Sequence, residues 1–442
     1  MIFSLLFTRR FAPLFWSQFF SAFNENLVRN MLAMIILFKV GSENAGPLVT
    51  LALAAFILPS LVLSGLGGQL ADGHDKARVA RWLKLAEMGV QVVAAAGYWY
   101  NSIVALYAAL FLLGLIATLY TPIKYGILPD HLKREELTAG NALVEGAGFV
   151  AILLGLAAGG LTGLEGISRG LVVTELVAVA VLCLVSTWFI PAAPSAVPNL
   201  RIDRNLFGST FSLIGDLRRD QRMWVGGLGS SWFWLSGSVS LVLVPVVVKQ
   251  RIGAGVEVET AISLFFAVGV GIGSLLAGWL SRGRILLWHA PWAVAAMGVF
   301  LLDAGWSTAV VGEAQGTLSL PDFLRSGAGI RLVADLMGLA CAGGLFSVPV
   351  FSAVQSWAAP ERRARVVAGV GVLNAVFMII GAGVTAALQA PWIAVPNPLL
   401  LVALGAANLA AAVYFYRNLP DPGAVAAGAA TLPDAVAARP GE

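Results

Sequence analysis

Long apolar segments recur along almost the whole chain and are separated by short polar loops. A membrane-spanning helix needs about 20 mostly apolar residues to cross the hydrocarbon core. On that scale the sequence predicts twelve such helices, at 11–38, 47–71, 78–99, 102–122, 138–162, 169–190, 222–248, 258–280, 285–304, 331–350, 366–389 and 397–417. The pattern therefore predicts an all-α membrane protein with twelve transmembrane helices.

Composition leads to the same class. The chain has 442 residues, of which 58% are hydrophobic and only 12% are charged, whereas a soluble domain has about 25% charged residues. The first apolar run contains Gln18, Glu25 and Arg29 and no small-residue cleavage site. We interpret it as the first membrane helix and not as a cleaved signal peptide.

Basic residues are distributed unevenly between the two sets of loops. About 21 of the 28 lysines and arginines, Lys84 and Lys124 among them, fall on the side of the two termini. About six fall on the other side, and Arg29 is assigned to a helix interior. By the positive-inside rule, both termini are then cytoplasmic and the number of spans is even. The net charge of +4 thus indicates topology, and we expect no nucleic-acid partner.

The longest polar connection, 191–221, divides the chain at its midpoint and contains Pro191, Pro194 and Pro198. We expect a six-helix bundle at 1–190, a cytoplasmic linker at 191–221 and a second six-helix bundle at 222–417. The Ala/Pro/Gly-rich tail, 418–442, is expected to be disordered. Weak self-similarity relates the halves, since the segment around Asp72 that ends one helix matches the segment around Arg282.

The first predicted helix carries a stripe of polar residues. At 100° per residue, Gln18, Ser21, Glu25 and Arg29 point in nearly one direction. A charge near the bilayer centre is costly unless it is paired or faces water. Two interpretations remain open, because Glu25 and Arg29 are spaced i, i+4. They form a structural ion pair, or they line a cavity that offers the acceptor and the donor that a zwitterionic headgroup needs.

Further polar groups lie in the same half, namely Lys124, Asn141 and Glu145, with Asn24 and Asn26 beside Glu25. The predicted helix 222–248 has five serines and no charge in its interior. A cavity that is polar on one side and apolar on the other suits an amphiphile, although a sugar permease could also be asymmetric.

Features of several enzyme classes are missing from the sequence. None of the three histidines begins the His-x4-Asp pattern in which an acyltransferase uses histidine as its base. No Gly-x4-Gly-Lys-Ser/Thr phosphate loop occurs, which argues against ATP-driven transport. Two isolated cysteines make neither a disulfide framework nor a zinc site. We expect no enzymatic activity, no cofactor and no metal.

Four blocks of sequence resemble the bacterial lysophospholipid transporter family of the major facilitator superfamily. They are FFSAFNENLVRNML, GGQLADGHDKARVARWLKLAE, YTPIKYGILPDHLKREELTAGNALVEG with FVAILLGLAAGG, and GGLFSVPVFSAVQ with ERRARVVAGVGVLNAVFM. The resemblance implies a secondary transporter, a flippase that moves lysophospholipid, chiefly lysophosphatidylethanolamine, across the inner membrane for reacylation. That family usually has aspartate where this chain has Glu25. Some relatives carry fused acyltransferase domains, so a separate acyltransferase is a candidate partner, and we expect a monomer.

The resemblance also implies a gate at the cytoplasmic face, made by Asp72, Lys76 and Arg78. Within the cavity, our hypothesis assigns Glu25 to the headgroup ammonium, and Arg29 with Lys124 to the phosphate. The remaining polar wall would comprise Asn24, Asn26, Asn141 and Glu145. The alternatives are a permease or efflux pump for a small solute, and a membrane-embedded partner of an acyltransferase that does not itself transport.

Overall fold

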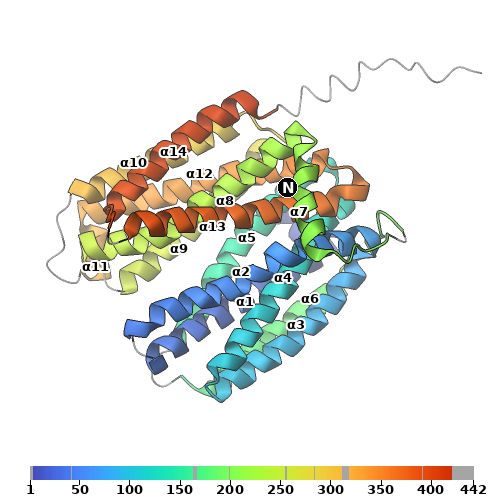
Figure 1. Ribbon diagram of the computed structural model, residues 1–442, viewed down its shortest axis with the longest axis horizontal. Helices are drawn as coiled ribbons and strands as arrows, with labels where there is room; N and C mark the ends of the chain where they lie inside the picture. The colour runs from blue at the N-terminus through green and yellow to red at the C-terminus, as the bar shows by residue number, and fades with distance from the viewer. Residues whose placement is uncertain are drawn as a thin grey trace, which may run out of the picture.

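The computed structural model describes residues 3–40, 42–162, 167–198, 200–253, 256–282, 284–310, 318–390 and 392–420. Within these ranges the chain is almost entirely helical and no β-strand occurs. Long helices lie side by side in two bundles (Figure 1). The first bundle contains α1 (Ala12–Val40), α2 (Ser42–Gly73), α3 (Lys76–Trp99), α4 (Ile103–His131), α5 (Arg134–Leu161) and α6 (Arg169–Trp188).

The second bundle contains α8 (Gln221–Val247), α9 (Val256–Ser281), α10 (Ala290–Val310), α12 (Gly327–Trp357), α13 (Arg363–Gln389) and α14 (Asn397–Asn418). Shorter helices connect or extend these: η1 (Phe3–Phe7), α7 (Leu206–Arg218), η2 (Val248–Ile252), α11 (Leu320–Arg325) and η3 (Pro360–Arg362). The predicted disordered tail falls mostly at 421–442, outside the described residues.

Ten of the described helices are long and apolar enough to cross a membrane. The prediction of an all-α membrane protein is confirmed, and ten of the twelve predicted spans meet this criterion. The other two long helices are α1 and α3, with 29 and 24 residues. Both carry charges in their middle turns, Glu25 and Arg29 in α1 and Lys84 and Glu87 in α3. The helices of lowest apolar content are thus the two that carry most of the interior charge.

Some predicted spans are too short. The predicted helix 102–122 continues through Pro122 and Pro129 to His131, and the predicted helix 138–162 begins at Arg134. The predicted helix 331–350 runs from Gly327 to Trp357. Apolar length marks only the hydrocarbon core, whereas the helices extend beyond it, and proline is tolerated inside membrane helices.

The two bundles repeat one pattern of helix pairing. In the first, α1 packs on α5 and α6, α2 on α4, and α3 on α4 and α6. In the second, α8 packs on α13 and α14, α9 on α12, and α10 on α12 and α14. Close approach depends on small residues, since a Cβ on Gly155 would overlap the Phe23 carbonyl oxygen of α1.

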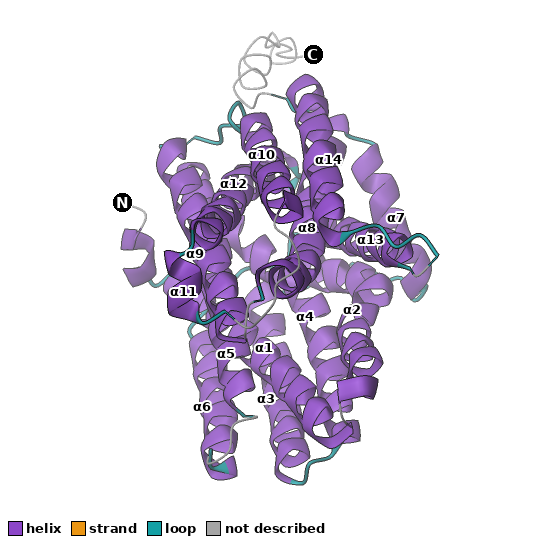
Figure 2. Ribbon diagram, turned by 90° about the vertical axis from the view of Figure 1, so that its left-hand side faces the viewer, coloured by secondary structure: helices purple, strands orange, loops and turns teal. Residues whose placement is uncertain are grey.

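We call the end of the bundles that holds His131, Ile190 and Arg363 the linker end. There the connection after α6 leads into α7, a helix that the sequence analysis did not predict. Figure 2 shows α7 beside α2 and α13. Thr210 Oγ1 donates a 2.9 Å hydrogen bond to the Val62 carbonyl of α2. Leu213 packs against α13, where a Cβ built on Gly369 would lie 3.2 Å from the Leu213 Cβ. The linker is therefore a packed element that touches both bundles.

Candidate functional site

Six charged side chains, three of each sign, lie in one group among α1, α3, α4 and α5 of the first bundle. Charged groups are rare within membrane helices and mark functional sites when they occur. α1 contacts α2, α4, α5 and α6, so its polar face lies among helices and not against lipid. The six residues are Glu25 and Arg29 on α1, Lys84 and Glu87 on α3, Lys124 on α4, and Glu145 on α5.

The most deeply buried of these are Lys84 and Glu87. Their Nζ and Oε2 atoms are 2.5 Å apart, and the two side chains are 0% and 3% exposed. Lys84 Nζ also donates to Ser21 Oγ at 2.6 Å and lies 3.8 Å from the centroid of the Tyr120 ring. The assignment of Lys84 to a loop is therefore wrong. It belongs to the bundle interior, because α3 begins at Lys76, more than two turns earlier.

Ser21 links this buried pair to Glu25. Its Oγ lies 3.0 Å from Glu25 Oε1 and 3.1 Å from Glu87 Oε1. A hydroxyl has one proton to donate, so Ser21 bonds to one carboxylate at a time while it accepts from Lys84. Glu25 is consequently held at the edge of the buried pair through a shared hydroxyl.

The remaining four charges, those of Glu25, Arg29, Lys124 and Glu145, are partly exposed and are held by neutral groups. Arg29 donates to the Asn26 side chain, and Glu145 accepts from the Tyr125 hydroxyl. Lys124 Nζ lies 4.6 Å from the centroid of the Tyr125 ring.

None of the ion pairs found among the described residues joins Glu25 to Arg29. The structural ion pair that the i, i+4 spacing allowed is therefore not formed here. Lys124 is within electrostatic reach of Glu25 and Glu145. Two carboxylates and two cationic groups thus lie in one region, and none of the four is within hydrogen-bond distance of a group of opposite charge in this set. Each remains available for a charge-assisted hydrogen bond to a ligand.

The asparagines predicted for the polar wall lie in different places. Asn26 joins the site through Arg29. The Asn24 side chain is buried toward α6, where its Nδ2 is 3.5 Å from the Leu176 carbonyl. Asn141 donates across the two bundles, to Gln355 Oε1 at 2.7 Å and to Ser352 Oγ at 3.1 Å on α12. The structure does not bring Asn24 or Asn141 to the charged group.

Ion pairs at the linker end join the two bundles. Asp72 is 0% exposed and accepts from Arg365 Nε at 3.0 Å and from the Ala364 amide at 3.2 Å. Asp130 lies 2.9 Å from Lys76 Nζ and 3.4 Å from an Arg363 guanidinium nitrogen. Five of these six residues are charged groups that pair across or along the junction.

The predicted gate is therefore only partly assembled as expected. Asp72 and Lys76 lie in this junction, but Arg78 is exposed, and only its backbone amide is bonded, to Asp75 Oδ1 at 2.8 Å. The arginines that complete the junction come from α13 of the second bundle. The sequence analysis had counted them only as topology signals. We call the contacts of Asp72, Lys76 and Asp130 with Arg363 and Arg365 the latch.

Aromatic contacts also join the bundles, one group at the depth of the charged site and one pair nearer the linker end. Phe149 of α5 lies 6.4 Å from Phe233 and 6.3 Å from Trp234 of α8, measured between ring centroids. Nearer the linker end, the rings of Tyr125 and Phe351 are 4.6 Å apart. The described contacts therefore close the linker side of the site.

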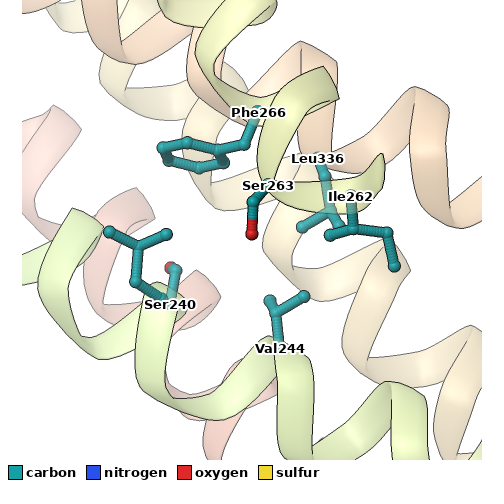
Figure 3. A pocket seen from close by; sticks show the side chains of 7 residues that line it. Ser240, Val244, Ile262, Ser263, Phe266 and Leu336 are labelled. Carbon is teal, nitrogen blue, oxygen red and sulfur yellow. The ribbon is translucent and has the colours of Figure 1, made fainter. Parts of the chain in front are cut away.

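The second bundle has neutral polar groups where the first has charges. Ser231 Oγ is 2.9 Å from Asn374 Oδ1, and Trp232 Nε1 donates to Asn408 Oδ1 at 3.0 Å. A mainly apolar cavity lies between α8, α9 and α12, and Figure 3 shows Phe266 and Leu336 across it from Ser240 and Val244. Its lining is completed by Leu241, Ile262 and Ser263.

A family model described as Major Facilitator Superfamily matches residues 14–321. The chain belongs to the Major Facilitator Superfamily. It is similar to the lysophospholipid transporter LplT of Serratia proteamaculans (strain 568), with 29% identity over 276 residues, 61% of this chain and 66% of that protein. It is 31% identical over the same length to the lysophospholipid transporter LplT of Yersinia pestis (strain Pestoides F), of which 64% is covered. The chain thus spans slightly less than two thirds of the length of these relatives.

Solved structures of this superfamily share the fold. The human organic anion transporter MFSD10 has a TM-score of 0.70 and 16% identity, over 91% of this chain and 99% of that one. A bacterial homologue of the iron transporter ferroportin, in its outward-facing state, also has a TM-score of 0.70 and 16% identity, over 93% and 99%. At this identity the likeness establishes the fold.

These matches confirm the prediction of a multi-pass membrane protein of the Major Facilitator Superfamily. They also agree with the resemblance to lysophospholipid transporters. The residues of the site remain predictions.

Proposed function

We propose that this protein is a secondary transporter, or flippase, that moves lysophospholipid across the bacterial inner membrane. The names of its relatives support this substrate class. The observation that carries the proposal is the set of four partly exposed charges, two of each sign, that are held by neutral neighbours instead of by one another. A zwitterionic headgroup with one ammonium and one phosphate matches such a set.

Each charge then has a role. Glu25, with Glu145 behind it, accepts from the headgroup ammonium, while Arg29 and Lys124 donate to the phosphate. Arginine suits this task because its planar fork matches phosphate oxygens. Asn26 orients the guanidinium of Arg29. The buried pair Lys84–Glu87 fixes Ser21, and through Ser21 it fixes the carboxylate of Glu25.

The second bundle supplies the apolar side of the site. Its α8 has no charged residue between Arg222 and its end at Val247, and the cavity between α8, α9 and α12 is lined mainly by aliphatic and aromatic side chains. The end of an acyl chain in this small cavity would exchange one apolar environment for another. It would leave the headgroup against the first bundle, consistent with lysophosphatidylethanolamine as the chief substrate.

By the positive-inside rule the linker end would lie in the cytoplasm, and reassigning Lys84 and Lys124 to the bundle interior leaves the excess of basic residues there intact. The latch and the Tyr125–Phe351 contact then close the cytoplasmic side, so the described arrangement would admit substrate from the periplasmic side. Release to the inner leaflet requires the contacts of Asp72 with Arg365 and of Tyr125 with Phe351 to separate.

The test is transport of radiolabelled lysophosphatidylethanolamine by the purified protein in proteoliposomes, with empty vesicles and the Glu25→Gln variant as controls. We expect protein-dependent movement between leaflets that Glu25→Gln reduces. Binding without movement would support the non-transporting partner of an acyltransferase instead. Transport of small soluble solutes with no effect of lysophospholipid would support the ordinary permease.

A further inference from the structure

The helix α7 has two apolar faces, and only one of them is packed. Ser209, Thr210, Leu213 and Leu217 are buried against the bundles. Phe207 and Phe211, which are spaced i, i+4 and share a face, are 60% and 53% exposed. An exposed apolar face on a helix whose other face is already packed indicates a surface that binds lipid or another molecule.

The depth of α7 places this open face beside the membrane. Thr210 Oγ1 donates to the Val62 carbonyl at 2.9 Å and accepts from the Gly65 amide at 3.1 Å. Val62 lies about 16 Å along α2 from its end at Gly73, at the usual rise per residue. Since Ala54–Gly73 qualifies as a membrane span, the middle of α7 runs alongside embedded helix, and its outward phenyl rings face lipid.

The segments at both ends of α7 are anchored close to the ends of membrane helices. Before α7, the Asp203 amide donates to Gln69 Oε1 at 2.7 Å, close to the end of α2. Near the other end of α7, Asp216 pairs with Arg362 at 2.7 Å, beside the start of α13. These anchors place the ends of the helix near the boundary between headgroups and hydrocarbon, where amphipathic helices lie in a bilayer surface.

Basic residues flank the two phenylalanines. Arg201 and Arg204 precede α7 and are exposed, and no salt bridge involves them within the described ranges. At the other end, Arg218 lies 4.8 Å from the centroid of the Trp224 ring, and Arg219 pairs with Asp216. The guanidinium groups of Arg201 and Arg204 are thus free to contact phosphate at headgroup level.

We propose that Arg201, Arg204, Phe207 and Phe211 form a binding surface for anionic phospholipid of the surrounding leaflet. The phenyl rings enter the upper acyl region, and the two arginines donate to the lipid phosphate. Anionic lipid is favoured over zwitterionic lipid because the latter carries its own cation. The surface faces outward from the bundles and does not depend on the transported substrate.

This surface also bears on the junction of the bundles. α7 bonds to α2 through Thr210 and packs on α13 through Leu213, the same two helices that Asp72 and Arg365 join. A lipid that holds α7 in place therefore reinforces the closed linker end.

The experiment measures the thermal unfolding temperature of the purified full-length protein in detergent while phosphatidylglycerol or phosphatidylcholine is added. Ligand that binds the folded state raises this temperature with concentration. We expect phosphatidylglycerol to act at lower concentration than phosphatidylcholine. In Arg201→Gln/Arg204→Gln the apparent affinity for phosphatidylglycerol should fall roughly fivefold per arginine. Phe207→Ser/Phe211→Ser should weaken the effect of both lipids.

The matched control is Arg282→Gln/Arg284→Gln, which removes two exposed arginines that follow α9 at the same end. It should keep the preference of the wild type for phosphatidylglycerol. The proposal is overturned if the wild type shows no such preference, if Arg201→Gln/Arg204→Gln retains it in full, or if the control loses it equally.

Discussion

The two bundles share one scheme of helix packing and differ in what they bury. α1 and α8 occupy matching positions, each packed on the fifth and sixth helices of its bundle. α1 carries Glu25 and Arg29, whereas the polar side chains of α8 near its middle are serines bonded to Asn374 and Asn408. Neutral groups in a low-dielectric interior need only hydrogen-bond partners, but charges need a counter-charge or water.

This difference shows how a repeated fold can divide two tasks. The packing of each bundle depends on small residues and apolar surfaces, so it tolerates either kind of polar interior. The first bundle has kept charges that its own neighbours do not neutralise, and we infer that it recognises the headgroup. Around the middle of α8 the second bundle presents apolar surface and hydrogen-bonded neutral groups, which suits the acyl chain.

The largest expected effect concerns the buried pair in the first bundle. Lys84→Met leaves the Glu87 carboxylate unpaired at 3% exposure, and we expect it to lower the free energy of unfolding by about 3–5 kcal/mol. The double variant Lys84→Met/Glu87→Met removes both charges and should recover most of the loss. Unfolding in detergent, followed by tryptophan fluorescence, measures both. A double variant as unstable as the single one would mean that the pair is not the source of the effect.

The latch gives the next largest effect. Asp72→Asn removes the charge that Arg365 meets at 3.0 Å and should weaken the closed linker end by about 1.5–3 kcal/mol. Spin labels at the exposed positions His74 and Glu361 should then report a larger population of long distances. Arg78→Gln is the matched control, because Arg78 is exposed and outside the latch. Equal shifts of the distance distribution in both variants would show that the total charge at the linker end, and not the Asp72–Arg365 contact, sets the population of the closed state.

A neutral counterpart in the second bundle sharpens the comparison. Asn408→Leu deprives Trp232 Nε1 of its acceptor, and we expect a loss of about 1–3 kcal/mol in the free energy of unfolding. The ratio of transport rates for zwitterionic and anionic lysolipids should stay at its wild-type value. A changed ratio would place headgroup recognition in the second bundle as well.

The smallest effect should come from the apolar cavity. Leu241 lies at its edge and is 52% exposed, so Leu241→Trp can add bulk there without repacking the core. We expect transport to fall by a few-fold for long acyl chains and less for short ones, in line with one or two methylene groups of lost contact. The measurement is transport in proteoliposomes across a series of chain lengths. Equal losses at all lengths would exclude this cavity as the acyl site.

Much of the fold could be predicted because apolar length and loop charge are local signals. The same is true of Glu25, which is the fourteenth residue of α1, as its sequence position suggested. Lys84 was misassigned because the count of basic residues in loops included every lysine and arginine near the start of a predicted helix. Its i, i+3 spacing to Glu87 was the available signal that it lies in a helix.

Other features have no local signal. Arg365 meets Asp72 from 293 residues away, and no periodicity in either segment specifies that partner. The helix α7 has 13 residues, so a search for apolar segments long enough to span a membrane does not detect it. Asn141 shares its helix with Glu145, but only the packing of α5 on α12 shows that it bonds across the bundles.

The central claim is that Glu25 and Arg29 recognise opposite ends of a headgroup and do not serve as a structural pair. The most direct test is transport of lysophosphatidylethanolamine and lysophosphatidylglycerol by Glu25→Gln, Arg29→Gln and the double variant. Glu25→Gln should weaken transport of the ethanolamine lipid by about ten- to a hundred-fold, the value of one charge-assisted hydrogen bond, and affect the glycerol lipid much less. Arg29→Gln should weaken both, since both carry a phosphate. Equal losses for both lipids in each single variant, with recovery in the double variant, would contradict the account.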